Sequence, residues 1–369
     1  MHRAKYVLLL LLLPACQSST HVVSTNAFEM SKASIQASDE LFVEPKSVEK
    51  DRRDFIKRVE SVREEDRRRL YEQYLKLIGA NGILDGIESV WPKCHTEAHD
   101  LGKVIFAYVR DIGSSLRVCV DRCFSGCMHG VLMEAFAGTT NQSPHRHVDL
   151  AAVKRVMNHT CYKNTVMTSS YSAGDCAHGV GHALMVLAGY DIPEAIQTCD
   201  GFQDRAMAYY CATGAYMEYV TERDAEDAES KSLLYPCDIY GYPAACSRYK
   251  LVHVVERHYQ ANKKMEELVR ECEKLAGKFR LGCFHGLGNA HMWLIASGAL
   301  PIKKVCGDGT DNERYMCIEG AMERMAKFHE KRALTVCEGL EDEDKKTCFT
   351  AVKHKMYSIK KDFALYLSE

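Results

Sequence analysis

The sequence lacks most of the short motifs that mark common enzyme classes. It contains no glycine-rich phosphate loop, no nucleophile elbow and no dinucleotide-binding fingerprint. It also lacks an excess of charge of either sign, because 48 Lys and Arg are interspersed with 50 Asp and Glu, for a formal net charge of −2. Nothing in this balance indicates a basic surface, so we expect no nucleic-acid partner.

Long hydrophobic runs are missing after the first residues. The run at residues 6–13 follows two basic residues and is too short to span a bilayer, so it predicts a secretion signal. The signal ends in LPAC at 13–16, which resembles the bacterial lipobox except for its proline. We therefore predict a signal peptide over 1–16 and a lipid anchor at Cys16. The protein would then be an exported lipoprotein, located in the bacterial outer membrane or periplasm and tethered to the membrane by its lipid. The alternative is ordinary cleavage, for instance after Ser18, which would release a soluble secreted protein.

Composition divides the rest of the chain into three parts. Residues 17–48 are rich in Ser, Thr and Ala and predict a flexible tether. Residues 51–78 have helical periodicity, and we expect the segment 49–92 to form N-terminal capping helices. The remaining segment, 93–369, is rich in cysteine and predicts one helical domain.

The 17 cysteines of an exported chain are expected to pair, because thiols oxidise in that compartment. If Cys16 is lipidated, an even number remains. Twelve of these residues fall into six regular pairs: Cys161 with Cys176, Cys199 with Cys211, Cys237 with Cys246, Cys272 with Cys283, Cys306 with Cys317, and Cys337 with Cys348. By analogy with these pairs, we predict Cys119–Cys127 and Cys94–Cys123 in the irregular group before them.

The regular pairs predict a repeat. Their first members are 38, 38, 35, 34 and 31 residues apart, and a period near 35 is typical of stacked helical hairpins. In each unit a short helix precedes the first cysteine and a longer helix starts at the second. The predicted fold is therefore all-α, a disulfide-stapled helical-hairpin repeat array. Residues 119–358 resemble tetratricopeptide and Sel1-like solenoids in build only, and this resemblance implies no function.

The longer helices share two features when they are aligned on their first cysteine. Glycine recurs three residues after that cysteine, which suggests that neighbouring helices cross closely. Histidine occurs two residues after it in three units, as Cys-x-His-Gly, at His129, His178 and His285. In a repeat array, equivalent positions point to one surface.

Two histidine pairs converge on the same face. His178 and His182 are spaced i, i+4, as are His95 and His99, so each pair can reach one ion from one helix. Neutral imidazole binds copper, iron and zinc, whereas the thiolates are consumed as disulfides. We therefore predict a transition-metal site of one or two ions. Its predicted ligands are His95, His99, His129, His178, His182 and His285, and Glu97, Asp100 and Glu134 are candidate ligands or acid/base groups.

These patterns leave two main functions open, besides a metal carrier that would use exposed Met and His side chains and for which Met133 and Met217 are a hint. The first is a metal-binding envelope protein, as an enzyme either an oxidoreductase or a hydrolase, and it requires the imidazoles to converge within a few ångströms. No catalytic residue is identified for it. The second is a non-catalytic scaffold for a protein, peptide or glycan partner, in which each histidine only caps or packs against a neighbouring turn.

Overall fold

The computed structural model describes residues 32–42, 48–120, 122–137, 173–307 and 309–356, together with residues 154, 157, 160 and 161. This part of the chain is helical and contains no strand, which confirms the predicted all-α class. None of its helices combines the length and the apolar character that a membrane crossing requires. The predicted signal over 1–16 and its Cys16 anchor lie outside the described residues.

The described helices range in length from 5 to 28 residues. In chain order they are α1 (Lys32–Asp39), α2 (Glu49–Val59), α3 (Arg67–Val90), α4 (His95–Val109), α5 (Ile112–Val118), α6 (Gly126–Ala137), α8 (Ala173–Leu187), α9 (Ile192–Cys199), α10 (Arg205–Ser230), α11 (Pro243–Gln260), α12 (Met265–Glu273), α13 (Gly277–Ala290), α14 (Met292–Ser297), α15 (Ile302–Cys306), α16 (Asp311–Glu338) and α17 (Asp342–Lys353). Two single 3₁₀ turns, η3 (Glu64–Asp66) and η4 (Cys123–Ser125), precede α3 and α6.

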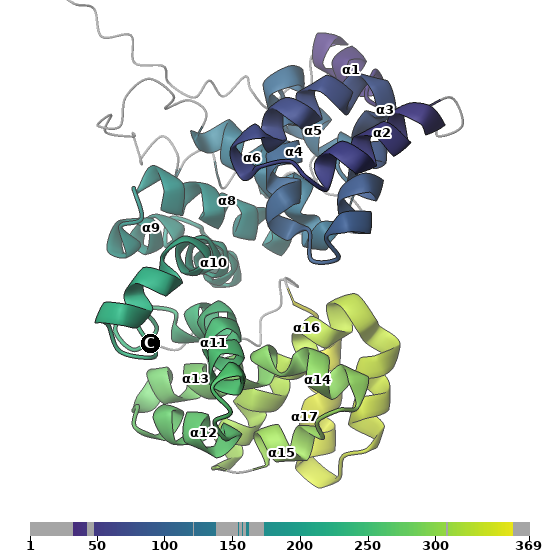
Figure 1. The fold of residues 1–369 in the computed structure, drawn as a ribbon. Helices are drawn as coiled ribbons and strands as arrows, with labels where there is room; N and C mark the ends of the chain where they lie inside the picture. Colours follow the sequence, from purple (N-terminus) through teal and green to yellow (C-terminus); the bar gives the residue numbers. More distant parts are fainter. Residues whose placement is uncertain are drawn as a thin grey trace, which may run out of the picture.

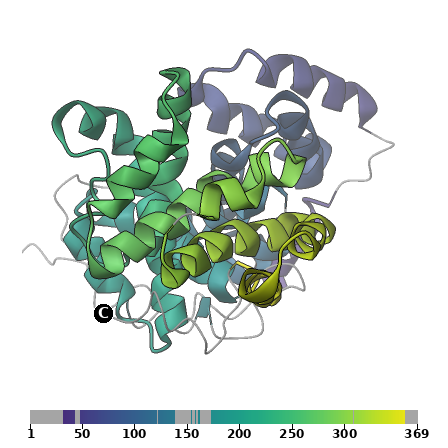
Figure 2. The same cartoon turned by 90° about the horizontal axis from the view of Figure 1, so that it is seen from below.

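Successive long helices pack against one another along the chain. The order of contact is α4, α6, α8, α10, α11, α13 and α16, from the blue end of the ribbon to the yellow end (Figure 1). Seen from below, the C-terminal helices lie in front of the N-terminal ones (Figure 2). The helices curve so that α16 returns to α8 and η4: Lys327 of α16 donates to Asp175 of α8, and Phe328 packs edge to face on Phe124 of η4, with ring centroids 4.9 Å apart. This curvature encloses the space beside the histidines.

All eight predicted disulfides are present. The six regular ones have sequence separations of 9 to 15 residues, and the two irregular ones, Cys94–Cys123 and Cys119–Cys127, have separations of 29 and 8. Cys199 is the last residue of α9 and bonds Cys211, so the disulfide joins a short helix to a longer one as predicted. The longer helix α10 begins at Arg205, however, and not at the cysteine as the sequence predicted, because the turn before it is shorter than expected. Each such disulfide restricts the conformations of the unfolded chain and thereby stabilises the fold by about 3 kcal/mol on the chain-entropy model.

Part of the predicted tether belongs to the folded domain. Helix α1 and the turn after it, residues 32–42, lie within the segment 17–48, and α1 packs on α5. Leu41 is buried, and Arg117 of α5 donates to Ser38 and to Asp39, at 2.6 Å in both cases. A single buried leucine in a polar segment gives no periodicity, so composition alone assigned these residues to the tether.

The recurring glycines allow neighbouring helices to approach backbone to backbone. A Cβ atom built on Gly130 of α6 would lie 2.0 Å from the carbonyl oxygen of His99 on α4. One built on Gly214 of α10 would lie 1.8 Å from the carbonyl oxygen of His178 on α8. No side chain fits at these distances, so the predicted close crossing is confirmed.

Candidate metal centre

Four buried histidines from three helices converge at one point. His95 and His99 come from α4, His129 from α6 and His182 from α8. One ring nitrogen of each lies within 4.8 Å of those of the other three, and all four side chains are buried. We call these residues the four-histidine cluster. His178 lies at its edge, with its ring centroid 4.9 Å from those of both His129 and His182.

The helix geometry explains this convergence. The i, i+4 spacing places His95 and His99 on one face of α4, and the same spacing places His178 and His182 on one face of α8. Helix α6 packs between these two helices and presents His129 from the third side. The close contact at Gly130 draws α6 onto α4 and brings the adjacent His129 within reach of the other rings.

Hydrogen bonds at Nδ1 fix the tautomer of two cluster members. Nδ1 of His95 lies 3.1 Å from the carbonyl oxygens of both Cys123 and Phe124, and Nδ1 of His182 lies 2.8 Å from Oε2 of Glu218. Because these oxygens accept hydrogen bonds, Nδ1 carries the proton in both neutral rings. Nε2 of each ring is then a lone-pair donor, which is the form that coordinates a metal ion.

His178 is held in the same tautomer. Its Nδ1 lies 2.7 Å from Oγ1 of Thr213, and that hydroxyl donates its own proton to the carbonyl oxygen of Tyr210 at 2.6 Å. The hydroxyl therefore accepts from His178, and Nε2 of His178 carries a lone pair. This atom faces Nε2 of His182, also a lone-pair donor, at 3.2 Å.

Facing lone pairs require a cation. Nε2 of His99 lies 3.0 Å from Nε2 of His95, close enough for an N–H of His99 to donate to that lone pair or for both nitrogens to bind one ion. A proton can bridge one such pair, whereas a single metal ion accepts lone pairs from four rings together. The arrangement is therefore chemically suited to a transition-metal ion.

Burial keeps the rings of His95, His99, His129 and His178 neutral. Burial, followed by repulsion from a charge on His182, lowers the pKa of His95 to about 3. Burial is also the largest cause that holds the pKa values of His99, His129 and His178 well below their usual range, and neighbouring imidazoles add to it. At neutral pH protons therefore do not compete with a metal for these ligands.

This burial predicts acid-sensitive folding of the metal-free protein. Because the folded pKa of His95 is below its unfolded value near 6.5, the stabilisation is present above that pH and is lost as pH falls toward 3. Each such ring makes the free energy of unfolding fall by about 1.4 kcal/mol more for every unit by which pH decreases in this range. Denaturant unfolding at pH 7 and pH 5, with disulfides intact, should show a shallower slope for His95→Gln. Equal slopes for the variant and the wild type would contradict this account.

Glu218 was not predicted from the sequence, and it orients a cluster member. Burial acts to raise its pKa, but the hydrogen bond and charge interaction with His182 outweigh burial and lower that pKa, which keeps the side chain a carboxylate. A carboxylate on Nδ1 fixes the ring and makes its Nε2 a stronger donor. The only sequence signal is that Glu218 follows Met217, which lies six residues after Cys211 as His182 lies six residues after Cys176.

Glu218→Gln should therefore weaken metal binding without unfolding the protein. The amide is nearly isosteric and uncharged, so Nε2 of His182 loses basicity while the ring keeps its place. We expect an affinity about 10–100-fold lower, the usual effect of removing such a partner. A competition titration against a chromogenic chelator measures this change, with Glu229→Gln, at an exposed position on the same helix and outside the cavity beside the cluster, as the matched control. Equal affinities for wild type and Glu218→Gln would show that the carboxylate has no such role.

The structure does not bring the other predicted residues into the cluster. Asp100 accepts from Arg67 at 2.9 Å, and Glu134 lies 3.8 Å from Arg68, so these two carboxylates are engaged in ion pairs. Glu97 is half-buried on α4 and outside the cluster.

His285 belongs to a separate buried ionic group. Its Nε2 lies 3.0 Å from Oε1 of Glu323 on α16, and the same oxygen accepts from Arg248 of α11. All three side chains are fully buried. The predicted grouping of His285 with the other histidines is therefore corrected. Its position in the repeat is equivalent, but its neighbours are a carboxylate and a guanidinium, so it lies beside the buried Arg248–Glu323 ion pair.

A small polar cavity opens on one side of the cluster. It has a volume of about 80 Å³ and reaches His95, His99 and His182. Glu218 and Glu222 also line it. Carboxylates at such an opening attract cations, so this side offers a path by which a metal ion can reach the rings.

Comparisons with protein-family models, with curated proteins and with solved structures found no match to this chain. The functional assignment therefore rests on the geometry and chemistry of the four-histidine cluster.

Proposed function

We propose that this protein is an exported metal-binding protein that holds a transition-metal ion between His95, His99, His129 and His182. The observation that carries the proposal is the convergence of four buried imidazoles, with one ring nitrogen of each within 4.8 Å of those of the other three. The metal hypothesis required this convergence. The scaffold hypothesis required histidines that are spread out and satisfied by local contacts, so the geometry favours the first.

The ligand set restricts which metals the site can bind. Imidazole nitrogens suit zinc, copper and iron, whereas calcium and magnesium prefer oxygen. Sixteen cysteines are disulfide-bonded in the described residues and cannot act as thiolate ligands. Four neutral rings do not offset the positive charge of the ion, and only Glu218, through its hydrogen bond to His182, supplies negative charge. The ion would therefore act as a strong Lewis acid.

The site is compatible with an enzyme. His95 lines cavities on two sides of the cluster, so small molecules can reach the centre from solvent. A catalytic metal needs a position open to substrate, and displacement of one ring, or the space beside His178, would supply it. The reaction classes that fit are metal-dependent oxidation and hydrolysis.

The cellular setting follows from the disulfides. Eight disulfides in one chain fit an extracellular or periplasmic protein. We propose export by the signal at 1–16 and anchoring through a lipid on Cys16. We also propose that the cysteine-rich domain is a helical-hairpin repeat array, which the regular disulfide spacing and the contacts between successive long helices support.

Elemental analysis tests the proposed function. The protein is purified from a periplasmic preparation without chelator or affinity histidines, and we expect about one zinc, copper or iron ion per chain, as in other mononuclear sites. The same sample is then stripped and titrated with each ion in turn. A folded protein that contains no metal and takes up none of the three would overturn the proposal.

A further inference from the structure

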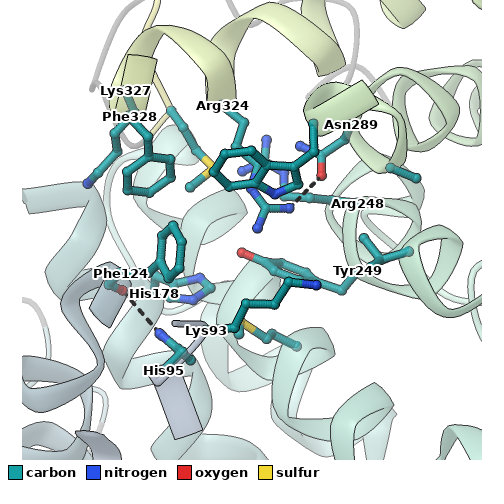
Figure 3. Close-up of a pocket in the computed structure, with 15 residues that line it drawn as sticks. Lys93, His95, Phe124, His178, Arg248, Tyr249, Asn289, Arg324, Lys327 and Phe328 are labelled. Carbon is teal, nitrogen blue, oxygen red and sulfur yellow. Dashed lines mark hydrogen bonds between the residues drawn. The ribbon is translucent and has the colours of Figure 1, made fainter. Parts of the chain in front are cut away.

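A second cavity lies on the other side of the histidines, where α16 meets α8 and η4. It has a volume of about 190 Å³ and reaches His95 and His178. Figure 3 shows these two histidines on one side of the cavity, with Asn289 of α13 and Arg324 of α16 on the opposite side. A molecule in this cavity therefore lies between the metal centre and the C-terminal helices.

The walls of this cavity carry basic side chains. Lys93, Arg248, Arg324 and Lys327 line it, and none of its described lining residues is acidic. Arg248 and Lys327 are also ion-paired, with Glu323 and Asp175 respectively. These ion pairs hold the two cations in fixed positions.

Arg324 is oriented across the cavity. Its Nη1 donates to Oδ1 of Asn289 at 3.2 Å, an uncharged partner (Figure 3). The guanidinium presents several N–H donors in a fixed plane, a geometry that matches a carboxylate. Together with the positive charge of a metal ion beside His95, this surface favours an anionic ligand over a neutral or cationic one.

Flat aromatic side chains form the remaining walls. Phe124 and Phe328 meet edge to face, and the ring of Tyr249 lies 5.8 Å from that of His178. The indole of Trp293 completes this lining. Such walls favour stacking with a ring. A cavity of about 150 Å³ admits benzene, so this one is large enough for a single ring with a small acidic group.

From these features we infer that the cavity binds a small aromatic carboxylate and presents it to the metal centre. The ring packs between the aromatic walls, and the carboxylate meets Arg324 and Lys93. This inference rests on the proposed metal function, because it names the class of ligand for that same site.

Benzoate is the probe that tests this inference. Calorimetric titration of the metal-loaded protein should show one benzoate per chain, bound at least tenfold more tightly than benzyl alcohol, which has the ring without the charge. Arg324→Gln should weaken benzoate at least tenfold, and Arg314→Gln, on the same helix but outside the cavity, should leave it unchanged. Lys93→Gln provides a second test at an exposed position, where the substitution does not disturb the core.

The metal content of each sample separates the two proposals. With cobalt(II) in the site, benzoate should also change the visible absorption spectrum, because it binds beside the ion. Metal-loaded protein that binds neither compound, or binds both equally, would overturn the aromatic-carboxylate inference and leave the metal function standing. Metal-free protein that cannot be loaded but binds benzoate through Arg324 would overturn the metal function and support the anion site.

Discussion

His99→Gln should abolish metal retention while leaving the fold intact. His99 is fully buried, and its Nε2 faces that of His95 at 3.0 Å, so the variant removes one of four converging donors. Loss of an outer partner of a ligand lowers metal affinity about 10–100-fold, and loss of the ligand itself should exceed that range. Glutamine is uncharged, as the buried histidine ring is in the folded protein, and the two side chains are similar in length. The substitution should therefore leave the fold intact.

The matched control for this variant is His253→Gln. His253 is half-buried on α11 and outside the cluster, so metal content should equal that of the wild type. Metal per chain is measured on both variants after gel filtration, with circular dichroism to confirm folding. A folded His99→Gln protein with the wild-type metal content would show that the ion binds elsewhere.

Gly130→Ala should destabilise the protein strongly and disrupt the cluster. The added Cβ would lie 2.0 Å from the carbonyl oxygen and 2.8 Å from the Cα of His99, so α4 and α6 must move apart. Backbone atoms cannot rotate away as a side chain can. We expect the free energy of unfolding to fall by about 3 kcal/mol or more, at the upper end of overpacking effects. Because His129 and His99 separate with their helices, metal affinity should fall as well.

Gly241→Ala is the control for the glycine prediction. A Cβ at Gly241 would meet only Cγ2 of Ile196, at 3.9 Å, so its stability should lie within about 0.5 kcal/mol of the wild type. Denaturant unfolding with intact disulfides measures both variants. If Gly130→Ala is as stable as Gly241→Ala, the helices do not approach as closely as the structure indicates.

The cysteine spacing predicted the covalent framework because each disulfide links segments close in sequence. The disulfide Cys119–Cys127 closes a short loop that contains η4 and ends in the first turn of α6. Even the longer link, Cys94–Cys123, connects the start of α4 to η4. In the same way, the i, i+4 rule predicted that His95 pairs with His99, because both residues lie on one helix.

Contacts between helices were harder to predict. Glu218 bonds His182 across 36 residues, and nothing in the local pattern says which residue of α10 faces α8. His285 shows the converse error, because it shares its offset from cysteine with His129 and His178. The side chain that faces this histidine position from the adjacent helix differs from unit to unit: Thr213 faces His178, whereas Glu323 faces His285.

The central claim is that histidine nitrogens, and not sulfur, hold the metal. X-ray absorption spectroscopy at the edge of the metal found in the purified protein tests this most directly. We predict a shell of imidazole nitrogens at about 2.0–2.1 Å, with the outer-ring scattering typical of histidine, and its weakening in His99→Gln. A sulfur shell near 2.3 Å, or an oxygen shell without imidazole scattering, would contradict the account.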